Sequence, residues 1–163
     1  WVNDGGTWYY LNASGKMATG WLNLGGAWYY LNSSGAMVTG WMNGGGPWYY
    51  LTGSGAMATG WLYDNGSWYY LDAVTGAMAT GWFQDGTTWY YSSSSGTMMT
   101  GWLNGGSSWY YLTGSGAMAT GWILDSGAWY YLGDTGAMVT GTQEIDGRSS
   151  TFSSSGRWVG YAS

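Results

Sequence analysis

The sequence contains no cysteine and no histidine, and these two absences remove several classes of chemistry. Without cysteine there is neither a disulfide framework nor a thiolate metal site. Histidine is the commonest general base and metal ligand, and cysteine is a common nucleophile, so both routes to a catalytic centre are missing. The eight acidic residues are scattered over different positions, whereas a glycosidase needs two carboxylates at a fixed separation. We therefore predict no catalytic site, no metal and no cofactor in this chain.

Charge is also scarce, because only 7% of the residues are charged. Three basic residues against eight acidic ones give a net charge of −5, which argues against nucleic acid as a partner and mildly favours a cationic ligand. No apolar run approaches 18 residues, so we predict no membrane insertion. With one proline, the sequence is instead rich in glycine (32), tryptophan (15) and tyrosine (16). This aromatic content supplies enough apolar area for the chain to fold.

A unit of twenty residues repeats almost end to end. One spacing is 21, and we place the extra residue of that unit in a loop at 72–76. Residues 1–141 are predicted to hold seven full repeats, and residues 142–163 a divergent C-terminal capping repeat with Thr142, Ser149, Ser150 and Thr151 at aromatic positions. Because the chain begins inside a repeat without a signal sequence, we expect it to be a fragment of a longer protein. Whether a catalytic domain precedes Trp1 in that protein is left open. The full repeats begin at Trp1, Trp21, Trp41, Trp61, Trp82, Trp102 and Trp122.

Each repeat is predicted to form a β-hairpin. A second tryptophan follows the first by seven residues, and glycine-rich pairs between them suit a two-residue turn. With the turn at Gly25-Gly26, Trp21 faces Tyr30, and the alternation of side chains puts Trp21, Trp28 and Tyr30 on one face of the hairpin. The opposite face carries Leu22, Tyr29 and Leu31. The Gly-rich tail of each unit is predicted to be a loop or a short strand.

Single hairpins are marginally stable in water, so the repeats must stack and bury one face against their neighbours. We therefore predict an all-β solenoid of stacked hairpins. The three large rings per unit have two interpretations from the residues alone. They are either core between hairpins, as in a purely structural spacer, or the walls of an open slot that binds a quaternary ammonium group or stacks sugar rings.

The recurring pattern Thr-Gly-Trp-x6-Trp-Tyr-Tyr-Leu-x4-Gly-Ala-Met-x-Thr-Gly, as in residues 39–60, resembles the choline-binding repeat of Gram-positive surface proteins, autolysins and phage lysins. The resemblance implies a left-handed superhelix and a non-catalytic, secreted module that anchors a protein to choline or phosphocholine on the teichoic and lipoteichoic acids of the cell wall. A related module that binds glucan or another carbohydrate is the alternative. Whether the C-terminal repeat forms a homodimer stays open.

The same resemblance implies which residues bind choline: two tryptophans of one hairpin and a tyrosine of the next. We assign the second tyrosine of each pair to this role, and Tyr29 and its equivalents to packing. A seventh box from Trp122 and Trp129 is expected to be impaired because Thr151 stands at its tyrosine position. The predicted boxes are Trp1, Trp8 and Tyr30; Trp21, Trp28 and Tyr50; Trp41, Trp48 and Tyr70; Trp61, Trp68 and Tyr91; Trp82, Trp89 and Tyr111; and Trp102, Trp109 and Tyr131. The methionines are expected either to close the boxes or to pack the loops, and they are Met37, Met57, Met78, Met98, Met118 and Met138.

Overall fold

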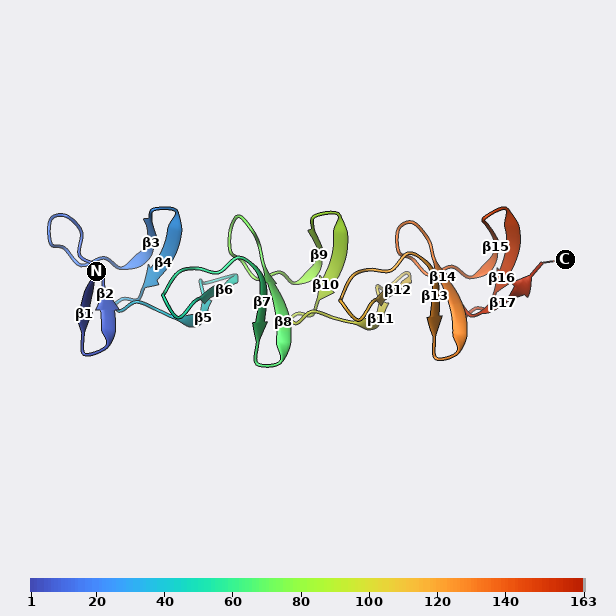
Figure 1. Cartoon of the computed structure of the whole chain (residues 1–163), viewed down its shortest axis with the longest axis horizontal. Coiled ribbons are helices and arrows are strands. Elements are labelled where there is room, and N and C mark those ends of the chain that lie inside the picture. The colour runs from blue at the N-terminus through green and yellow to red at the C-terminus, as the bar shows by residue number, and fades with distance from the viewer. Residues whose placement is uncertain (163) are drawn as a thin grey trace. The chain divides into compact units, whose positions relative to one another are not determined.

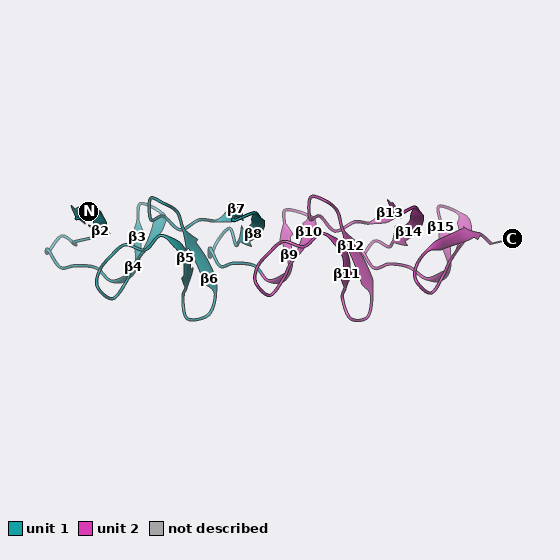
Figure 2. Cartoon of the chain, turned by 90° about the horizontal axis from the view of Figure 1, so that it is seen from below, with its two compact units in different colours: residues 1–79 teal, residues 80–163 magenta. Residues whose placement is uncertain are grey.

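The computed structural model describes residues 1–162 as strands joined by turns and loops. The chain divides into two compact units, residues 1–79 and 80–163 (Figure 2). Within the described residues, no helix is long and apolar enough to cross a membrane.

Unit 1 consists of four antiparallel hairpins, each a two-stranded sheet of its own. Within this unit, the fourth hairpin points in the same direction as the first (Figure 1). The strands are β1 (Val2–Asp4), β2 (Thr7–Tyr9), β3 (Gly20–Leu24), β4 (Ala27–Leu31), β5 (Gly40–Asn43), β6 (Trp48–Leu51), β7 (Gly60–Asp64) and β8 (Ser67–Leu71).

Unit 2 also consists of four hairpins, and the last of them gains a third strand, β17, which pairs with β16. The strands are β9 (Gly81–Asp85), β10 (Thr88–Ser92), β11 (Gly101–Asn104), β12 (Trp109–Leu112), β13 (Gly121–Asp125), β14 (Ala128–Leu132), β15 (Gly141–Ile145), β16 (Arg148–Phe152) and β17 (Trp158–Tyr161).

The strand register agrees with the turn chemistry. In β3–β4, Trp21 pairs with Tyr30 and Leu24 with Ala27, as predicted. The turn glycines Gly25 and Gly26 have φ of 60° and 91°, the positive values that a tight two-residue hairpin turn requires at both central positions.

Within each unit, main-chain hydrogen bonds join consecutive hairpins. After a hairpin, the loop doubles back so that its methionine forms a β-bridge with the last leucine of the strand, as Met37 does with Leu31. The Met37 N–H also donates to the Trp8 carbonyl of the preceding hairpin at 2.8 Å. The equivalent bond recurs from Met57 to Trp28 at 2.7 Å. Within each unit the fold is thus the predicted all-β solenoid of stacked hairpins.

In five repeats the leucine that follows the tyrosine pair in the second strand is fully buried, whereas its equivalent in the first repeat, Leu11, is 41% exposed. Leu31, Leu51 and Leu71 are fully buried, as are their equivalents in unit 2, Leu112 and Leu132. Ser92 stands at this position in the fifth hairpin, where it is buried with no hydrogen-bond partner for its hydroxyl. That hairpin therefore lacks the fully buried leucine of these five repeats, and with it the apolar surface which that leucine buries.

In six loops a glycine packs on the methionine of the preceding repeat. At Gly116, for example, φ is +82°, and an added Cβ would overlap the side chain of Met98. Gly55 lies in the same way on Met37. The absence of a side chain at these glycines therefore fixes the position of the methionines, which matters for the pockets described below.

Candidate functional site

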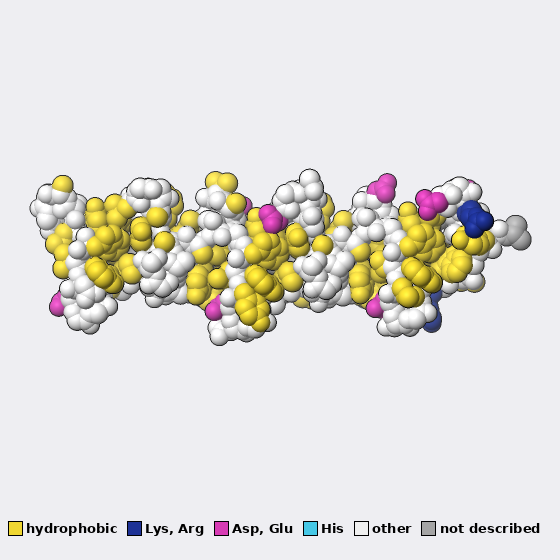
Figure 3. All heavy atoms as spheres, viewed as in Figure 1, with side chains coloured by type: hydrophobic (Ala, Val, Ile, Leu, Met, Phe, Trp, Pro, Cys, Tyr) yellow, Lys and Arg dark blue, Asp and Glu magenta, His cyan; other side chains and the backbone are white. Residues whose placement is uncertain are grey.

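Many tryptophans are left in contact with solvent. The second tryptophan of each of the seven full repeats is exposed, with Trp28 at 42% and Trp109 at 43%. Figure 3 shows hydrophobic side chains gathered in surface patches over both units. Such exposure rules out the spacer interpretation, in which all the aromatic rings are buried, and it is typical of a binding surface.

These tryptophans form the walls of open pockets. Trp21 and Trp28 of the second hairpin lie 6.3 Å apart, measured between ring centroids, and their planes are at 85°. Tyr49 of the third hairpin is 5.0 Å from Trp21. Together with Met57, these rings line a cavity of about 310 Å³. Two walls therefore come from one hairpin, and a third wall and the methionine from the next.

A third repeat contributes the rim of the same cavity. Val74 and Thr75, in the loop that follows the fourth hairpin, complete the lining. Residues from three consecutive repeats thus meet at one pocket, whereas the sequence analysis expected two.

The same arrangement recurs in both units. One cavity of about 370 Å³ is lined by Trp1, Trp8, Tyr29, Met37, Gly53 and Ser54. Another, of about 270 Å³, is lined by Trp102, Trp109, Tyr130, Met138, Ser154 and Ser155. The ring contacts of two further boxes follow the same pattern, with Trp41 4.8 Å from Tyr69 and Trp82 5.0 Å from Tyr110.

The prediction of the second tyrosine as the third wall is wrong in its placement. Tyr30 lies 5.3 Å from Trp21 of its own hairpin, whereas Tyr29 lies 5.1 Å from Trp1 of the preceding one. Tyr50 likewise contacts Trp41, at 5.2 Å.

The reason for this error is that a stacked hairpin meets its two neighbours with opposite faces. The face that carries the tryptophans of a hairpin meets the following hairpin. The opposite face, which carries the first tyrosine, meets the preceding hairpin, so it is the first tyrosine that contributes a ring to the preceding box. Four further second tyrosines likewise contact the first tryptophan of their own hairpin, namely Tyr70, Tyr91, Tyr111 and Tyr131. The predicted box of Trp61, Trp68 and Tyr91 joins residues of both units and stays a prediction.

The methionines occupy both of the predicted environments. Met37, Met57 and Met138 line pockets, and each also packs against a glycine of the following loop. Met78 and Met118 donate the equivalent main-chain hydrogen bonds, to the carbonyls of Trp48 and Trp89. Met98 packs against Gly116.

Two boxes also include a carboxylate. The indole N–H of Trp41 donates to Asp64 at 3.0 Å, and that of Trp102 donates to Asp125 at 3.2 Å. In both cases the acid lies 23 residues further along the chain, at the end of the first strand of the following hairpin. The negative charge therefore lies at the edge of an aromatic wall, where it favours a cation. Sequence reasoning missed these acids, although their shared place in the repeat is a visible signal.

A third carboxylate shapes the rim of the Trp21 pocket. Asp72 accepts hydrogen bonds from the Thr75 N–H at 2.7 Å, the Thr75 hydroxyl at 2.8 Å and the Val74 N–H at 3.0 Å. The Thr75 N–H contributes most to lowering the pKa of Asp72, because these bonds stabilise the charged form. The extra residue of this repeat thus lies in a loop held by its own acid, and it leaves Val74 87% exposed.

The seventh pair of tryptophans also forms a pocket, although we expected its box to be impaired. Trp122 and Trp129 are closed by Trp158 and Tyr161 of β17, around about 370 Å³. Trp158 lies 6.0 Å from Trp122 and 5.3 Å from Tyr161. The missing tyrosine is therefore replaced by rings from an extra strand, which the sequence analysis did not foresee.

A comparison with known protein families supports the interpretation of these pockets as binding sites. The choline-binding repeat profile matches residues 1–39, 38–83, 79–120 and 100–142. The chain belongs to the choline-binding repeat family. Modules of this family are non-catalytic binding domains. No curated protein sequence matches the chain significantly.

Solved structures agree with this family assignment. CbpJ of Streptococcus pneumoniae is 46% identical with a TM-score of 0.87, over 93% of this chain and 56% of CbpJ. Choline-binding protein F of the same species, solved in the presence of a peptidoglycan analogue, is 46% identical with a TM-score of 0.87, over 98% of this chain and 57% of that protein. The modular autolysin LytC of S. pneumoniae is 34% identical with a TM-score of 0.68, over 98% of this chain and 38% of LytC. The chain thus spans less than two thirds of each of these relatives.

The chemistry of the choline-binding repeats follows from the boxes. Their walls are electron-rich ring faces, which attract a weakly hydrated cation. Among the described residues, no cluster of three or more acids could hold a metal ion. The arrangement is therefore suited to recognition of a quaternary ammonium group.

Proposed function

We propose that this chain anchors its protein to a Gram-positive cell wall by binding the choline groups of teichoic and lipoteichoic acids. Each choline is held between two tryptophans of one hairpin and the first tyrosine and the methionine of the next. The observation that carries the proposal is the pocket of Trp21, Trp28, Tyr49 and Met57, an open cavity with three aromatic walls.

The energetics favour weak single sites that act together. A cation over an aromatic ring gains about 0.5–1 kcal/mol at an exposed site and about 2 kcal/mol or more when desolvated. Ordering and desolvation oppose this gain, so one box binds choline weakly. Several boxes on one polymer raise the overall affinity by about 10²–10⁴ over a single box. Retention on the wall, and with it a place at the cell surface, therefore depends on the number of occupied sites.

Calorimetric titration with choline tests the site chemistry. The neutral isostere 3,3-dimethylbutan-1-ol has the same shape without the charge, so it separates a cation site from a merely apolar one. We expect saturable binding of choline at millimolar concentration and far weaker binding of the isostere. Equal binding of the two ligands, or no saturation with choline, would refute the proposal.

A matched pair of variants tests which tyrosine completes the box. Tyr49→Leu removes a pocket wall, so choline binding followed at the Trp28 indole signal by NMR should weaken by about 5–30-fold, as loss of 1–2 kcal/mol of cation–π energy implies. Tyr50→Leu makes the same chemical change on the other face of the strand. It should change the dissociation constant of choline, measured at the Trp28 signal, by no more than about twofold. The opposite result would reassign the wall to the second tyrosine.

The polymer is identified by a pull-down with three surfaces. We expect the chain to bind teichoic acid that carries choline, and to be released by free choline. It should not bind teichoic acid in which ethanolamine replaces choline. Retention on an α-glucan resin instead would favour the carbohydrate alternative. Dimerisation through the C-terminal repeat stays a prediction, which sedimentation analysis with and without choline can test.

A further inference from the structure

The terminal pocket differs in composition from the others. Its walls are Trp122 and Trp129 of the seventh hairpin with Trp158 and Tyr161 of β17. Trp158 stands twenty residues after Met138 and so takes the place of the repeat's methionine. An indole replaces a thioether, and a tyrosine from a different strand replaces the repeat's own tyrosine.

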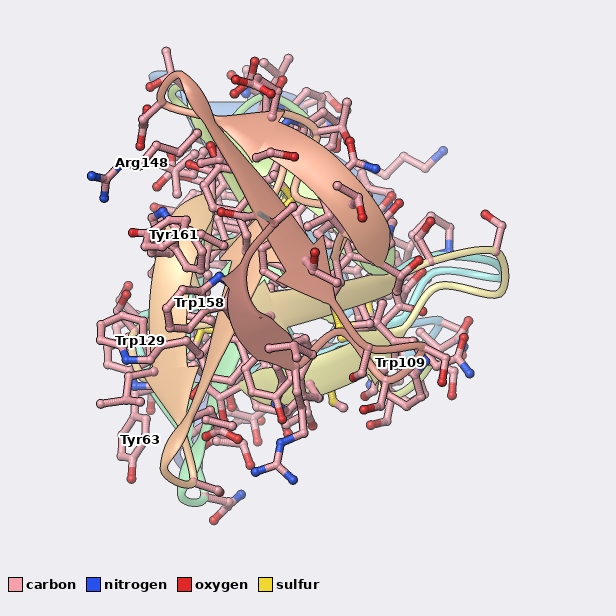
Figure 4. The ribbon with its side chains drawn as sticks, turned by 90° about the vertical axis from the view of Figure 1, so that its right-hand side faces the viewer. Tyr63, Trp109, Trp129, Arg148, Trp158 and Tyr161 are labelled. Carbon is pink, nitrogen blue, oxygen red and sulfur yellow. The ribbon has the colours of Figure 1, made fainter. Side chains whose placement is uncertain are left out.

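Arg148 lies beside this pocket. Its guanidinium carbon is 4.8 Å from the centroid of the Tyr161 ring. The sheet register explains the contact: Ser150 of β16 pairs with Tyr161, and Arg148 lies two residues before Ser150, on the same face of the strand. In Figure 4, Arg148 lies next to Tyr161, with Trp158 and Trp129 on the same side of the unit.

No acid neutralises this arginine among the described residues. Glu144 pairs with Ser149, so it lies on the opposite face of the hairpin, and Asp146 lies in the turn that precedes Arg148. Arg148 does not line the terminal pocket itself but lies over Tyr161, one of its walls. No arginine or lysine lines the other three pockets. The Trp102 box even carries the opposite charge, from Asp125. The terminal pocket is therefore an aromatic box with a positive charge at its edge.

A positive charge at this place changes which ligand the box prefers. It repels a bare quaternary ammonium ion in the box and attracts an anion tethered a few ångströms away from that ammonium. An arginine is also well suited to a phosphate, because its planar fork can donate two parallel hydrogen bonds.

We propose that the terminal pocket binds a zwitterion, with its quaternary ammonium among the rings of Trp122, Trp129, Trp158 and Tyr161 and its phosphate on Arg148. This inference rests on the proposed function, since it assumes that the aromatic boxes bind quaternary ammonium groups. It adds that the boxes are not equivalent: the terminal one prefers phosphocholine, whereas the Trp21 box, which has no arginine beside its walls, binds choline and phosphocholine about equally.

NMR of the chain with ¹⁵N-labelled tryptophan tests this, because each indole N–H gives a separate signal. The Trp158 signal is assigned by its disappearance in Trp158→Phe. We expect phosphocholine to bind at this signal about 3–10-fold more tightly than choline, and the preference to decrease in 0.5 M salt. At the Trp28 signal the two ligands should differ by less than about twofold. Inorganic phosphate alone should cause no saturable shift.

The matched variants are Arg148→Gln and Arg157→Gln, which remove the same charge from the same repeat. Arg148→Gln should abolish the preference for phosphocholine at Trp158, and Arg157→Gln should keep it. An unchanged preference in Arg148→Gln, or equal binding of the two ligands in the unaltered protein, would overturn the inference while leaving choline binding intact. Failure of both ligands to shift any indole signal would instead overturn the proposed function.

Discussion

Replacing Asp125 by asparagine tests whether a carboxylate strengthens the cation site of the Trp102 box. Trp102 donates its indole N–H to this acid at 3.2 Å. Asparagine has nearly the same size and keeps an acceptor oxygen, so the orientation of the indole should be preserved while the negative charge is lost. The variant thus separates the charge from the hydrogen bond.

The magnitude follows from Coulomb's law. Two unit charges about 6 Å apart attract each other by about 0.7 kcal/mol in bulk water and about 1.4 kcal/mol at an effective dielectric constant of about 40. A choline in this box should therefore bind about 3–10-fold more weakly in Asp125→Asn. The neutral isostere of choline should bind equally well to both proteins, because it does not feel the charge.

The assay is a choline titration followed at the Trp102 indole signal, at low salt and in 0.5 M salt. High salt should narrow the difference between variant and unaltered protein, since exposed charges are screened. Asp134→Asn is the control: it makes the same charge change at an exposed residue of the loop after β14, whereas the acid that accepts the Trp102 indole N–H is Asp125. An unchanged dissociation constant in Asp125→Asn, or an equal effect of Asp134→Asn, would refute the reasoning.

Three further predictions concern stability. Gly116→Ala should lower the Tm in a thermal melt by about 5–15 °C, because a side chain at positive φ is strained by about 1–2 kcal/mol and would overlap Met98. Gly114→Ala is the control and should change the Tm little, because an added Cβ there meets nothing within 4 Å. The lowered pKa of Asp72 contributes stability that is complete above its ordinary value of 3.8 and is lost as the pH falls through the lower folded value. In urea unfolding between about pH 5 and 2, the free energy of unfolding should therefore fall less steeply with decreasing pH in Asp72→Asn than in the unaltered protein. An equal slope in both proteins would show that other groups cause the loss of stability in acid. Ser92→Leu should raise the free energy of unfolding in urea by about 1–3 kcal/mol, because it removes a buried hydroxyl without a partner and adds the leucine found in other repeats. A loss of stability would mean that neighbouring side chains already fill the space.

The hairpins themselves were predictable from the sequence because their determinants are local. The pairing of Trp21 with Tyr30 follows from a two-residue turn and the alternation of side chains, and both are read within twelve residues of chain. Stacking followed from the instability of a lone hairpin.

The composition of the pockets was less predictable because it depends on how hairpins meet. Alternation shows which side chains share a face, but not which face of the next hairpin covers them, and this gap led to Tyr30 in place of Tyr29. The signal that could have corrected this assignment is that Tyr29 and Tyr30 lie on opposite faces of their hairpin, and that the face without the tryptophans meets the preceding hairpin. The rim residues, such as Val74, come from a repeat two steps away, and nothing in one twenty-residue unit indicates such a contact. β17 was missed because residues 142–163 were interpreted only as a divergent capping repeat.

Three of the pockets are each shared among three repeats, and this sharing has a consequence for how such chains change during evolution. Deletion or duplication of one repeat by recombination brings new neighbours together, and the same three surfaces meet again, so the chain gains or loses sites without leaving a broken one at the junction. The walls and the rim are also encoded in different repeats. A loop such as the one around Val74 can therefore lengthen or change its chemistry, and so alter the selectivity of a distant pair of tryptophans, while every residue of its own hairpin stays the same.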